Sequence, residues 1–383
     1  MCPVNPPRGG RRISSGWSAR IGTSREAKLR SFVDLAPTLL SLAGVQPPEW
    51  MQGHAFLGRF EAPPQKYSFG FRGRMDERYD MVRSVRNERY VYVRNYMPHL
   101  IYGQYLNYMF QTPTTQVWKK LFDEGKLQPP RTFFWEPKPA EELYDLECDP
   151  DEVHNLAGSA EHQAVLDELR QAHRAHVLAV RDVGFLSEAE MHRRASETTL
   201  YEFGHDRQRY PLEKNLEMAQ RATTWDAGAV DELRAGLRDA DSGVRYWAAQ
   251  GLLIRGGAGV TAAADELQAA LKDESPTVRI IAARTLGQYG GPADLKAALA
   301  VLEELASPQK NGAYASMFAL NAIDALGDKA APLQAMLKDL PQQDRAAPGR
   351  VNGYVSRLLE KIAGVKPAKP AAKPKRAKAK KAA

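Results

Sequence analysis

A pattern of seven residues recurs at a fixed distance in the second half of this chain, and it constrains the fold more than any other feature. The first copy consists of Leu237, Asp239, Val244, Arg245, Ala248, Ala249 and Leu252, and the second, 34 residues later, consists of Leu271, Asp273, Val278, Arg279, Ala282, Ala283 and Leu286. A repeat of this length with two helices per unit is typical of an α-solenoid, in which each unit packs on its neighbours. The second half is therefore predicted to be all-α.

A third, weaker copy follows. It aligns Ala319, Ala322, Ile323 and Gly327 with Ala282, Thr285, Leu286 and Gly290 at an offset of 37. The longer offset predicts a three-residue insertion near Asn311-Gly312. The units resemble HEAT repeats of the short kind, with Asp-x-x-x-x-Val-Arg between the helices. Segments 216–222 and 351–362 are predicted to cap the array. Arg245 and Arg279 could form a basic ladder, but they are predicted to cap helices or to pair with Asp239 and Asp273.

The first half predicts a mixed structure. Apolar residues at helical spacing predict a short buried helix over 36–43, ended by Gly44. Alternating residues in 81–86 and 90–94 flank a turn-prone Asn87-Glu88 and predict an antiparallel hairpin.

The remainder of the first half adds a strand and a long helix. Residues 98–140 have little periodicity and predict a long, packed irregular segment. A strand is predicted over 141–146 and an amphipathic helix over 159–182. The residues expected near one face of that helix are Ala164, Leu166, Leu169, His173 and Leu178.

Four segments of this half, 31–44, 53–58, 81–95 and 142–157, together look like the C-terminal part of a sulfatase. The most specific is Leu-Tyr-Asp-Leu at 143–146, followed by Asp-Pro-x-Glu-x-x-Asn-Leu at 149–156. The strand at 81–86 with its Tyr-rich continuation resembles the heparan N-sulfatase (sulfamidase) branch. The resemblance covers about 31–183 and implies an α+β subdomain, a small antiparallel sheet plus a long helix, joined to the HEAT-type solenoid.

The resemblance also implies a larger α/β domain that holds a calcium ion and a formylglycine made within Cys/Ser-x-Pro/Ala-x-Arg. In that family the aldehyde hydrate attacks sulfur, while the metal and basic residues stabilise the developing charge. This chain has no such motif, and Cys148-Asp-Pro-Asp-Glu152 carries Glu152 in place of the arginine. The aspartates that would hold calcium normally precede the 31–44 segment and are also absent. We expect no catalytic residue, calcium site or formylglycine in this chain.

A charged stretch before the 81–86 strand supplies the candidate substrate contacts, Arg74, Asp76 and Arg78. In resembling sulfatases, loops of this subdomain overhang the active site, and the planar fork of arginine suits sulfate and carboxylate groups. The alternative is an ordinary solvated hairpin. Five aromatic side chains of the next segment could either stack against a sugar or pack in the core: His99, Tyr102, Tyr105, Tyr108 and Trp118. His173 and His176 have the spacing of a two-histidine metal site but no local third ligand, so we predict no metal there.

Charge and length complete the domain organisation. The net charge of +7 divides into +6 in 1–30, −7 in 31–365 and +8 in 366–383, so the basicity belongs to the two ends and we do not expect a nucleic-acid partner. The predicted domains are an irregular basic start (1–30), the sulfatase-like region (31–183), a linker (184–215), the HEAT array (216–365) and a disordered Lys/Ala/Pro tail (366–383). We expect no membrane span.

Two hypotheses for function follow. The first is a C-terminal fragment of a sulfatase-family hydrolase that acts on sulfated carbohydrates, with its catalytic half encoded upstream. The second is a non-enzymatic HEAT scaffold that binds a protein partner on its concave face. The start lacks the apolar core of a secretory signal, although the resembling family is usually exported, so the compartment stays open.

Overall fold

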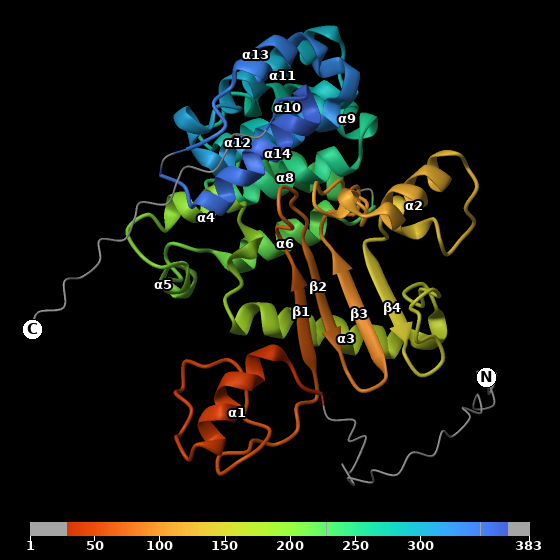
Figure 1. The fold of residues 1–383 in the computed structure, drawn as a ribbon, viewed down its shortest axis with the longest axis vertical. Helices are drawn as coiled ribbons and strands as arrows, with labels where there is room; N and C mark the ends of the chain where they lie inside the picture. Colours follow the sequence, from red (N-terminus) through yellow and green to blue (C-terminus); the bar gives the residue numbers. More distant parts are fainter. Residues whose placement is uncertain (1–28, 227, 345, 367–383) are drawn as a thin grey trace, which may run out of the picture. The chain divides into compact units, whose positions relative to one another are not determined.

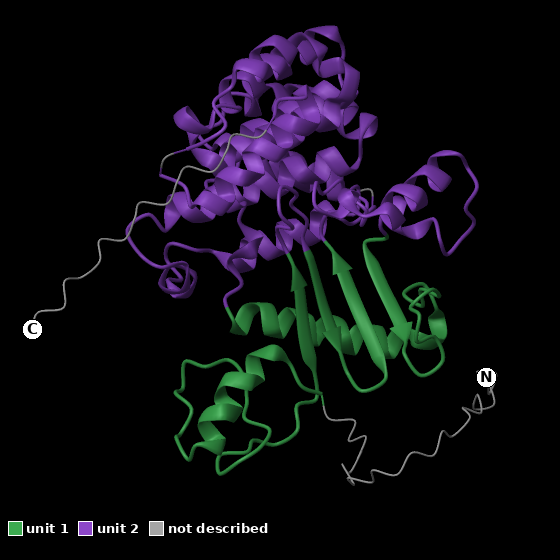
Figure 2. Cartoon of the chain, in the orientation of Figure 1, with its two compact units in different colours: residues 1–72, 82–95, 139–180 green, residues 73–81, 96–138, 181–383 purple. Residues whose placement is uncertain are grey.

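The computed structural model describes residues 29–226, 228–344 and 346–366 (Figure 1). The predictions for the basic start and the tail fall almost wholly outside these residues. The chain divides into two compact units (Figure 2). Unit 1 comprises residues 1–72, 82–95 and 139–180, and unit 2 comprises 73–81, 96–138 and 181–383. The units therefore do not meet at one boundary near 183, because two connections between strands belong to unit 2.

Unit 1 contains the predicted sheet. Strands β1 (Ser68–Arg72), β2 (Val82–Arg86), β3 (Tyr90–Asn95) and β4 (Glu141–Asp145) form an antiparallel sheet in the order β1-β2-β3-β4. Helix α3 (Gln163–Ala179) lies across one face of it (Figure 1). The hairpin, the later strand and the long helix predicted from the sequence are thus all present.

The register of the sheet explains its core. Val85 is paired with Tyr92, and Tyr92 with Leu143, so these three side chains share one face of the sheet. Leu166 and Leu169 of α3 complete the buried cluster. On α3, Val177 is buried with His173, whereas Leu178 is only half-buried and Ala164 is exposed, which corrects part of the predicted face.

Helix α1 (Leu35–Leu42) has the predicted position but not the predicted burial. Its polar side chains Thr38 and Ser41 are buried, whereas Leu39 is 67% and Leu42 is 58% exposed. The buried hydroxyls hold the following segment: Thr38 Oγ1 accepts a hydrogen bond from the Phe56 amide at 3.1 Å, and Ser41 Oγ accepts one from the Phe60 amide at 2.8 Å. These bonds satisfy the polar side of the helix and leave its apolar side outward.

Two glycines allow the segment after α1 to approach it closely. A Cβ on Gly53 would lie 1.9 Å from the carbonyl oxygen of Val33, which no side chain can accept. Gly58 has a φ of +93°, and a Cβ there would lie 2.7 Å from the backbone of Ser41. The glycines that bound the sulfatase-like 53–58 segment are therefore required by the local backbone.

Unit 2 is largely helical. Its helices are α2 (Pro113–Asp123), α4 (Glu188–Arg194), α5 (Leu200–His205), α6 (Leu212–Ala222), α7 (Ala229–Gly236), α8 (Ser242–Ile254), α9 (Gly257–Ala270), α10 (Pro276–Tyr289), α11 (Pro292–Leu305), α12 (Pro308–Leu326), α13 (Gln334–Asp339) and α14 (Gly349–Ala363). The predicted caps correspond to α6 and α14. Helix α2 interrupts the segment that was predicted to be irregular.

Helices α8, α10 and α12 carry the three copies of the repeat. The recurring apolar residues Val244, Ala248, Ala249, Leu252, Val278, Ala282, Ala283 and Leu286 are all buried. Gly312 has a φ of +78° and interrupts the first turns of α12, at the place of the predicted insertion. The periodicity therefore reports the internal packing of the array.

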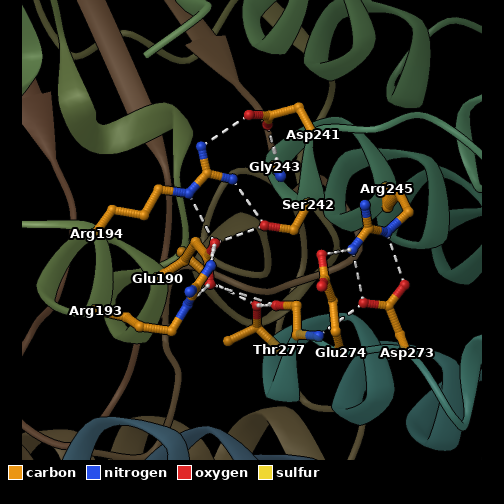
Figure 3. A network of polar contacts seen from close by, with 12 residues as sticks. Glu190, Arg193, Arg194, Asp241, Ser242, Gly243, Arg245, Asp273, Glu274 and Thr277 are labelled. Atoms are coloured by element: carbon orange, nitrogen blue, oxygen red, sulfur yellow. Dashed lines mark hydrogen bonds and ion pairs between the residues drawn. The ribbon is translucent and has the colours of Figure 1, made fainter. Parts of the chain in front are cut away.

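Residues 184–215, predicted to be a linker, instead contain α4, α5 and the start of α6. The carboxylate of Glu190 accepts hydrogen bonds from Arg193, from Arg194 at 2.7 Å and from Ser242 at 2.5 Å, and Arg194 also contacts Asp241 at 2.8 Å (Figure 3). Trp247 donates to the carbonyl of Phe185 at 2.8 Å. These long-range contacts make the segment part of unit 2.

Candidate functional site

The three predicted substrate contacts lie in the connection between β1 and β2, within unit 2. Arg74 donates from Nε to Glu188 at 2.5 Å. Asp76 has a φ of +47° and lies 3.6 Å from Arg350 and 3.5 Å from Arg357. The structure thus gives Arg74 a carboxylate partner and leaves Asp76 in looser ion pairs at a surface.

Arg78 is more deeply engaged than the other two. Its guanidinium donates to the Tyr105 carbonyl at 2.8 Å, to Asn321 Oδ1 at 2.7 Å and to Asp324 Oδ2 at 2.7 Å. Burial opposes ionisation of Asp324, but Arg78 and Lys361 outweigh it and lower the pKa of that carboxyl. Arg78 therefore fastens the β1–β2 connection to α12.

Arg74, Asp76 and Arg78 line two cavities of unit 2. The first, called the Arg74 cavity, is about 490 Å³ and is lined by Arg74 and Asp76 together with Met75, Leu106, Tyr108, Arg350, Val351 and Tyr354. The second, called the Arg284 cavity, is about 380 Å³ and is lined by Arg78 among residues of 97–105 and of α8, α10 and α12. The predicted trio is therefore divided between two cavities.

The Arg284 cavity contains residues that the sequence analysis did not single out. Arg284 is half-buried, and Gln250 is 2% exposed. Burial lowers the pKa of Arg284 to about 10, so the guanidinium stays protonated at neutral pH. Burial, with Arg284 and Lys138 nearby, lowers the pKa of His99 well below its ordinary value, so this imidazole is neutral there.

The aromatic candidates divide between packing and cavity walls. Trp118 stacks on Phe134 with ring centroids 4.8 Å apart and donates to the Arg131 carbonyl at 3.0 Å, so it packs within its own segment. Tyr102 lies beside the Lys138 ammonium. Tyr108 is exposed at the Arg74 cavity, and Tyr105 lines the Arg284 cavity. Among the predicted aromatic candidates, Tyr105, Tyr108 and His99 therefore line a cavity.

The histidine pair lies in unit 1 and is engaged in ring contacts. His173 meets Tyr92 edge-on at 6.2 Å, and His176 stacks on Phe69 at 3.7 Å. Across residues 29–226, 228–344 and 346–366, no group of three or more His, Cys, Asp or Glu side chains is arranged to hold a metal ion.

Comparison with known proteins finds similarity to sulfatases and, separately, to HEAT repeats. An ulvan-active sulfatase from Formosa agariphila is 41% identical over 167 residues, which are 43% of this chain and 28% of that protein. A second ulvan-active sulfatase from the same organism is 28% identical over 152 residues, which are 38% of this chain and 28% of that protein. Residues 230–317 match HEAT repeats. The chain therefore has sulfatase homology over part of its length, together with HEAT repeats, and its match spans 28% of each curated relative.

Solved structures are also similar over part of the chain. A candidate sulfatase from Bacteroides thetaiotaomicron matches 38% of this chain and 24% of its own, with 24% identity and a TM-score of 0.25. A structure in complex with its substrate D-glucosamine-2-N,6-O-disulfate matches 38% of this chain and 23% of its own, with 19% identity and a TM-score of 0.24. Among the described helices, none is long and apolar enough to cross a bilayer.

Proposed function

We propose that this chain is the C-terminal region of a sulfatase-family hydrolase that removes sulfate from a sulfated polysaccharide. The 41% identity to an ulvan-active sulfatase supports the family and the class of substrate. The heparan N-sulfatase branch suggested by the 81–86 strand stays a prediction, since both curated relatives are named for ulvan.

The single structural observation that carries the proposal is the reversed burial of α1. Helix α1 buries Thr38 and Ser41 and exposes Leu39 and Leu42. Burial of apolar surface stabilises a folded protein by about 25 cal/mol per Å², so the exposed leucines forgo that stabilisation in water. Phe32 and Trp50 are exposed beside it in the sequence, at 88% and 67%. Exposed apolar groups gathered in one segment are typical of an interaction surface. The occupant we propose is the larger α/β domain that the sulfatase resemblance implies, since this chain matches 28% of each curated relative.

In this proposal, calcium and formylglycine belong to that larger domain, where they would supply the nucleophile and stabilise charge on the sulfate. Arg74, Asp76 and Arg78 stay the predicted contacts to the sugar. Arg350, which pairs with Asp76 and has an 83% exposed side chain, is the most accessible charged group beside them, whereas Arg74 and Arg78 are largely buried against carboxylate partners.

The alternative is a binding protein whose HEAT array is the functional unit, and the match of 230–317 to HEAT repeats favours it. An association experiment separates the two. The 383-residue chain is mixed with a separately expressed protein that comprises the part of the Formosa agariphila relative outside the matched 28%, and binding is measured with wild type and with Leu39→Asp. The proposal expects the wild-type chain to bind the added protein and Leu39→Asp not to bind it. Equal binding by the wild type and the variant, or no binding by the wild type, would contradict the proposal.

A further inference from the structure

One position of the repeat is polar in all three copies. Gln250 follows Ala248-Ala249, Arg284 stands 34 residues later after Ala282-Ala283, and Asn321 stands at the offset of 37 that relates the third copy to the second. The three side chains come from α8, α10 and α12, and all of them line the Arg284 cavity. A polar residue at one position of successive buried helices forms a row across the array.

The row is only partly satisfied by the protein. Asn321 is bonded on both sides, because its Oδ1 accepts from Arg78 and its Nδ2 donates to the Glu77 carbonyl at 3.0 Å. Gln250 is buried, and its Oε1 finds no donor among the described residues. Arg284 donates from Nε to Gln288 Oε1 at 3.2 Å, and no described residue accepts from its Nη1 or Nη2. Leaving a buried polar group without a partner costs about 1–3 kcal/mol, so such a row favours a bound ligand.

The charge of the cavity is positive. Arg78 is neutralised by Asp324, and Asp324 is shared with Lys361 at 2.8 Å. Arg284 forms no ion pair with a carboxylate among the described residues, although the charge of Asp324 in the same cavity acts on it. A guanidinium that is not paired with a carboxylate of its own attracts an anion with two oxygens that its fork can bind.

A histidine and an apolar wall complete the cavity. Both ring nitrogens of His99 are shielded from solvent and lack hydrogen-bond partners among the described residues. Tyr105 and Phe318 supply aromatic faces of the kind that pack against the apolar side of a sugar ring. The volume of about 380 Å³ lies within the usual range of about 300–1,000 Å³ for small-molecule sites.

We propose that the Arg284 cavity binds a sugar that carries a carboxylate or a sulfate, with Arg284 holding the anionic group while Gln250 and His99 line the cavity beside the sugar. This site lies within unit 2 and is built on the repeats, so it goes beyond the sulfatase assignment and does not depend on it. It would give the HEAT array a role in holding an acidic carbohydrate.

The test is isothermal titration of the full 383-residue chain with D-glucuronate, with D-glucose 6-sulfate and with D-glucose. The proposal expects at least one of the two acidic sugars to bind at millimolar concentrations, with D-glucose at least tenfold weaker. Comparison of the two acidic sugars decides between carboxylate and sulfate. Equal binding of all three sugars, or binding of none, would overturn the proposal.

Three substitutions locate the binding. Arg284→Gln places in the second repeat the residue that the first repeat holds at the same position, so the helix is expected to fold, and it should weaken acidic-sugar binding about tenfold or more. Arg284→Lys keeps the charge and should retain more of the binding. Arg238→Gln removes an arginine that is 72% exposed outside the cavity and should leave binding unchanged. Equal losses in Arg284→Gln and Arg238→Gln would show non-specific charge attraction and reject the site.

A second readout guards against misfolding of the variants. In the wild-type chain, the NMR signals of the His99 ring should move on addition of the acidic sugar, because His99 lines the cavity and the ligand would lie beside its ring. Unmoved His99 signals during saturable binding would place the sugar elsewhere and refute the assignment.

Discussion

The guanidinium of Arg245 in one repeat donates to both carboxylate oxygens of Asp273 in the next, at 2.7 and 2.9 Å. Each side chain is only 9% exposed, and Arg245 also donates to the Asp239 and Ala240 carbonyls at 2.9 and 3.0 Å. At this junction the arginine of one repeat and the aspartate of the next thus hold the two repeats together.

Arg245→Gln should therefore destabilise unit 2 substantially. Removing one partner of a buried ion pair leaves the other charge uncompensated, which costs about 3–5 kcal/mol. The matched control is Arg279→Gln, because Arg279 occupies the same position of the next repeat but pairs with Glu304, whose side chain is 58% exposed. The control should lose about 1 kcal/mol or less. Urea unfolding measures both variants, and equal losses would contradict the assigned role.

Glu190 should make unit 2 sensitive to acid. Burial alone would raise the pKa of Glu190, but hydrogen bonds from Arg193, Ser242 and Arg194 outweigh it and lower the pKa from 4.5 to about 2. A carboxyl whose pKa is depressed in the folded state stabilises that state above the unfolded pKa and loses this contribution as pH falls toward the folded pKa. The contribution is roughly 3 kcal/mol at neutral pH.

Glu190→Gln tests that assignment. The variant should be less stable than wild type at pH 7, and the difference should shrink between pH 4.5 and pH 2. Urea midpoints across this range measure it. Glu197→Gln is the control, since Glu197 is an exposed residue of unit 2, and it should leave the urea midpoint unchanged at every pH. A difference for Glu190→Gln that is constant with pH would contradict the role given to its carboxylate.

Arg78 and Asp76 should respond differently to substitution. Arg78→Gln should destabilise unit 2 by about 3 kcal/mol or more, because it leaves the carboxylate of Asp324 with Lys361 as its remaining cationic partner. Asp76→Asn should change stability by less than about 1 kcal/mol, since its ion pairs at 3.5 and 3.6 Å are long and partly exposed. Thermal unfolding compares the two, and the reverse order of losses would refute the anchoring role of Arg78.

The two sides of α1 should behave in opposite ways. Thr38→Val removes the hydroxyl that accepts from the Phe56 amide and donates to the Asp34 carbonyl at 2.6 Å, so it should cost about 1–3 kcal/mol locally. Leu39→Ala removes an exposed leucine and should change the same stability by less than about 0.5 kcal/mol. Amide hydrogen exchange of residues 35–60 reports both, and faster exchange in Leu39→Ala alone would show that the leucine is packed.

The sequence predicted those parts of the fold that depend on local pattern. The 34-residue repeat located α8 and α10, and alternation located β2 and β3, because burial of one face imposes a period on the residues. It did not predict α4, which is short and is stabilised by the distant Ser242 and Asp241 through Glu190 and Arg194.

The candidate sites were harder to predict, because each combines residues that are far apart in the chain. Arg284 carries no local sign of function, and it gains one only when Gln250 and Asn321 are found at the equivalent positions and His99 is found opposite. The polar residue that recurs after the buried alanines was the signal that could have identified the row. The outward leucines of α1 could not be predicted, since the helical period gives the spacing of a face and not its partner.

The most direct test of the sulfatase proposal uses ulvan as the substrate and compares the sulfate that two proteins release from it. One is the 383-residue chain, and the other is the product of any longer reading frame that continues upstream of its Met1 codon in the genome. The account predicts that the upstream frame encodes Cys/Ser-x-Pro/Ala-x-Arg and that the longer protein releases sulfate while the 383-residue chain does not. Sulfate release by the 383-residue chain alone, or an upstream sequence without that motif, would contradict it.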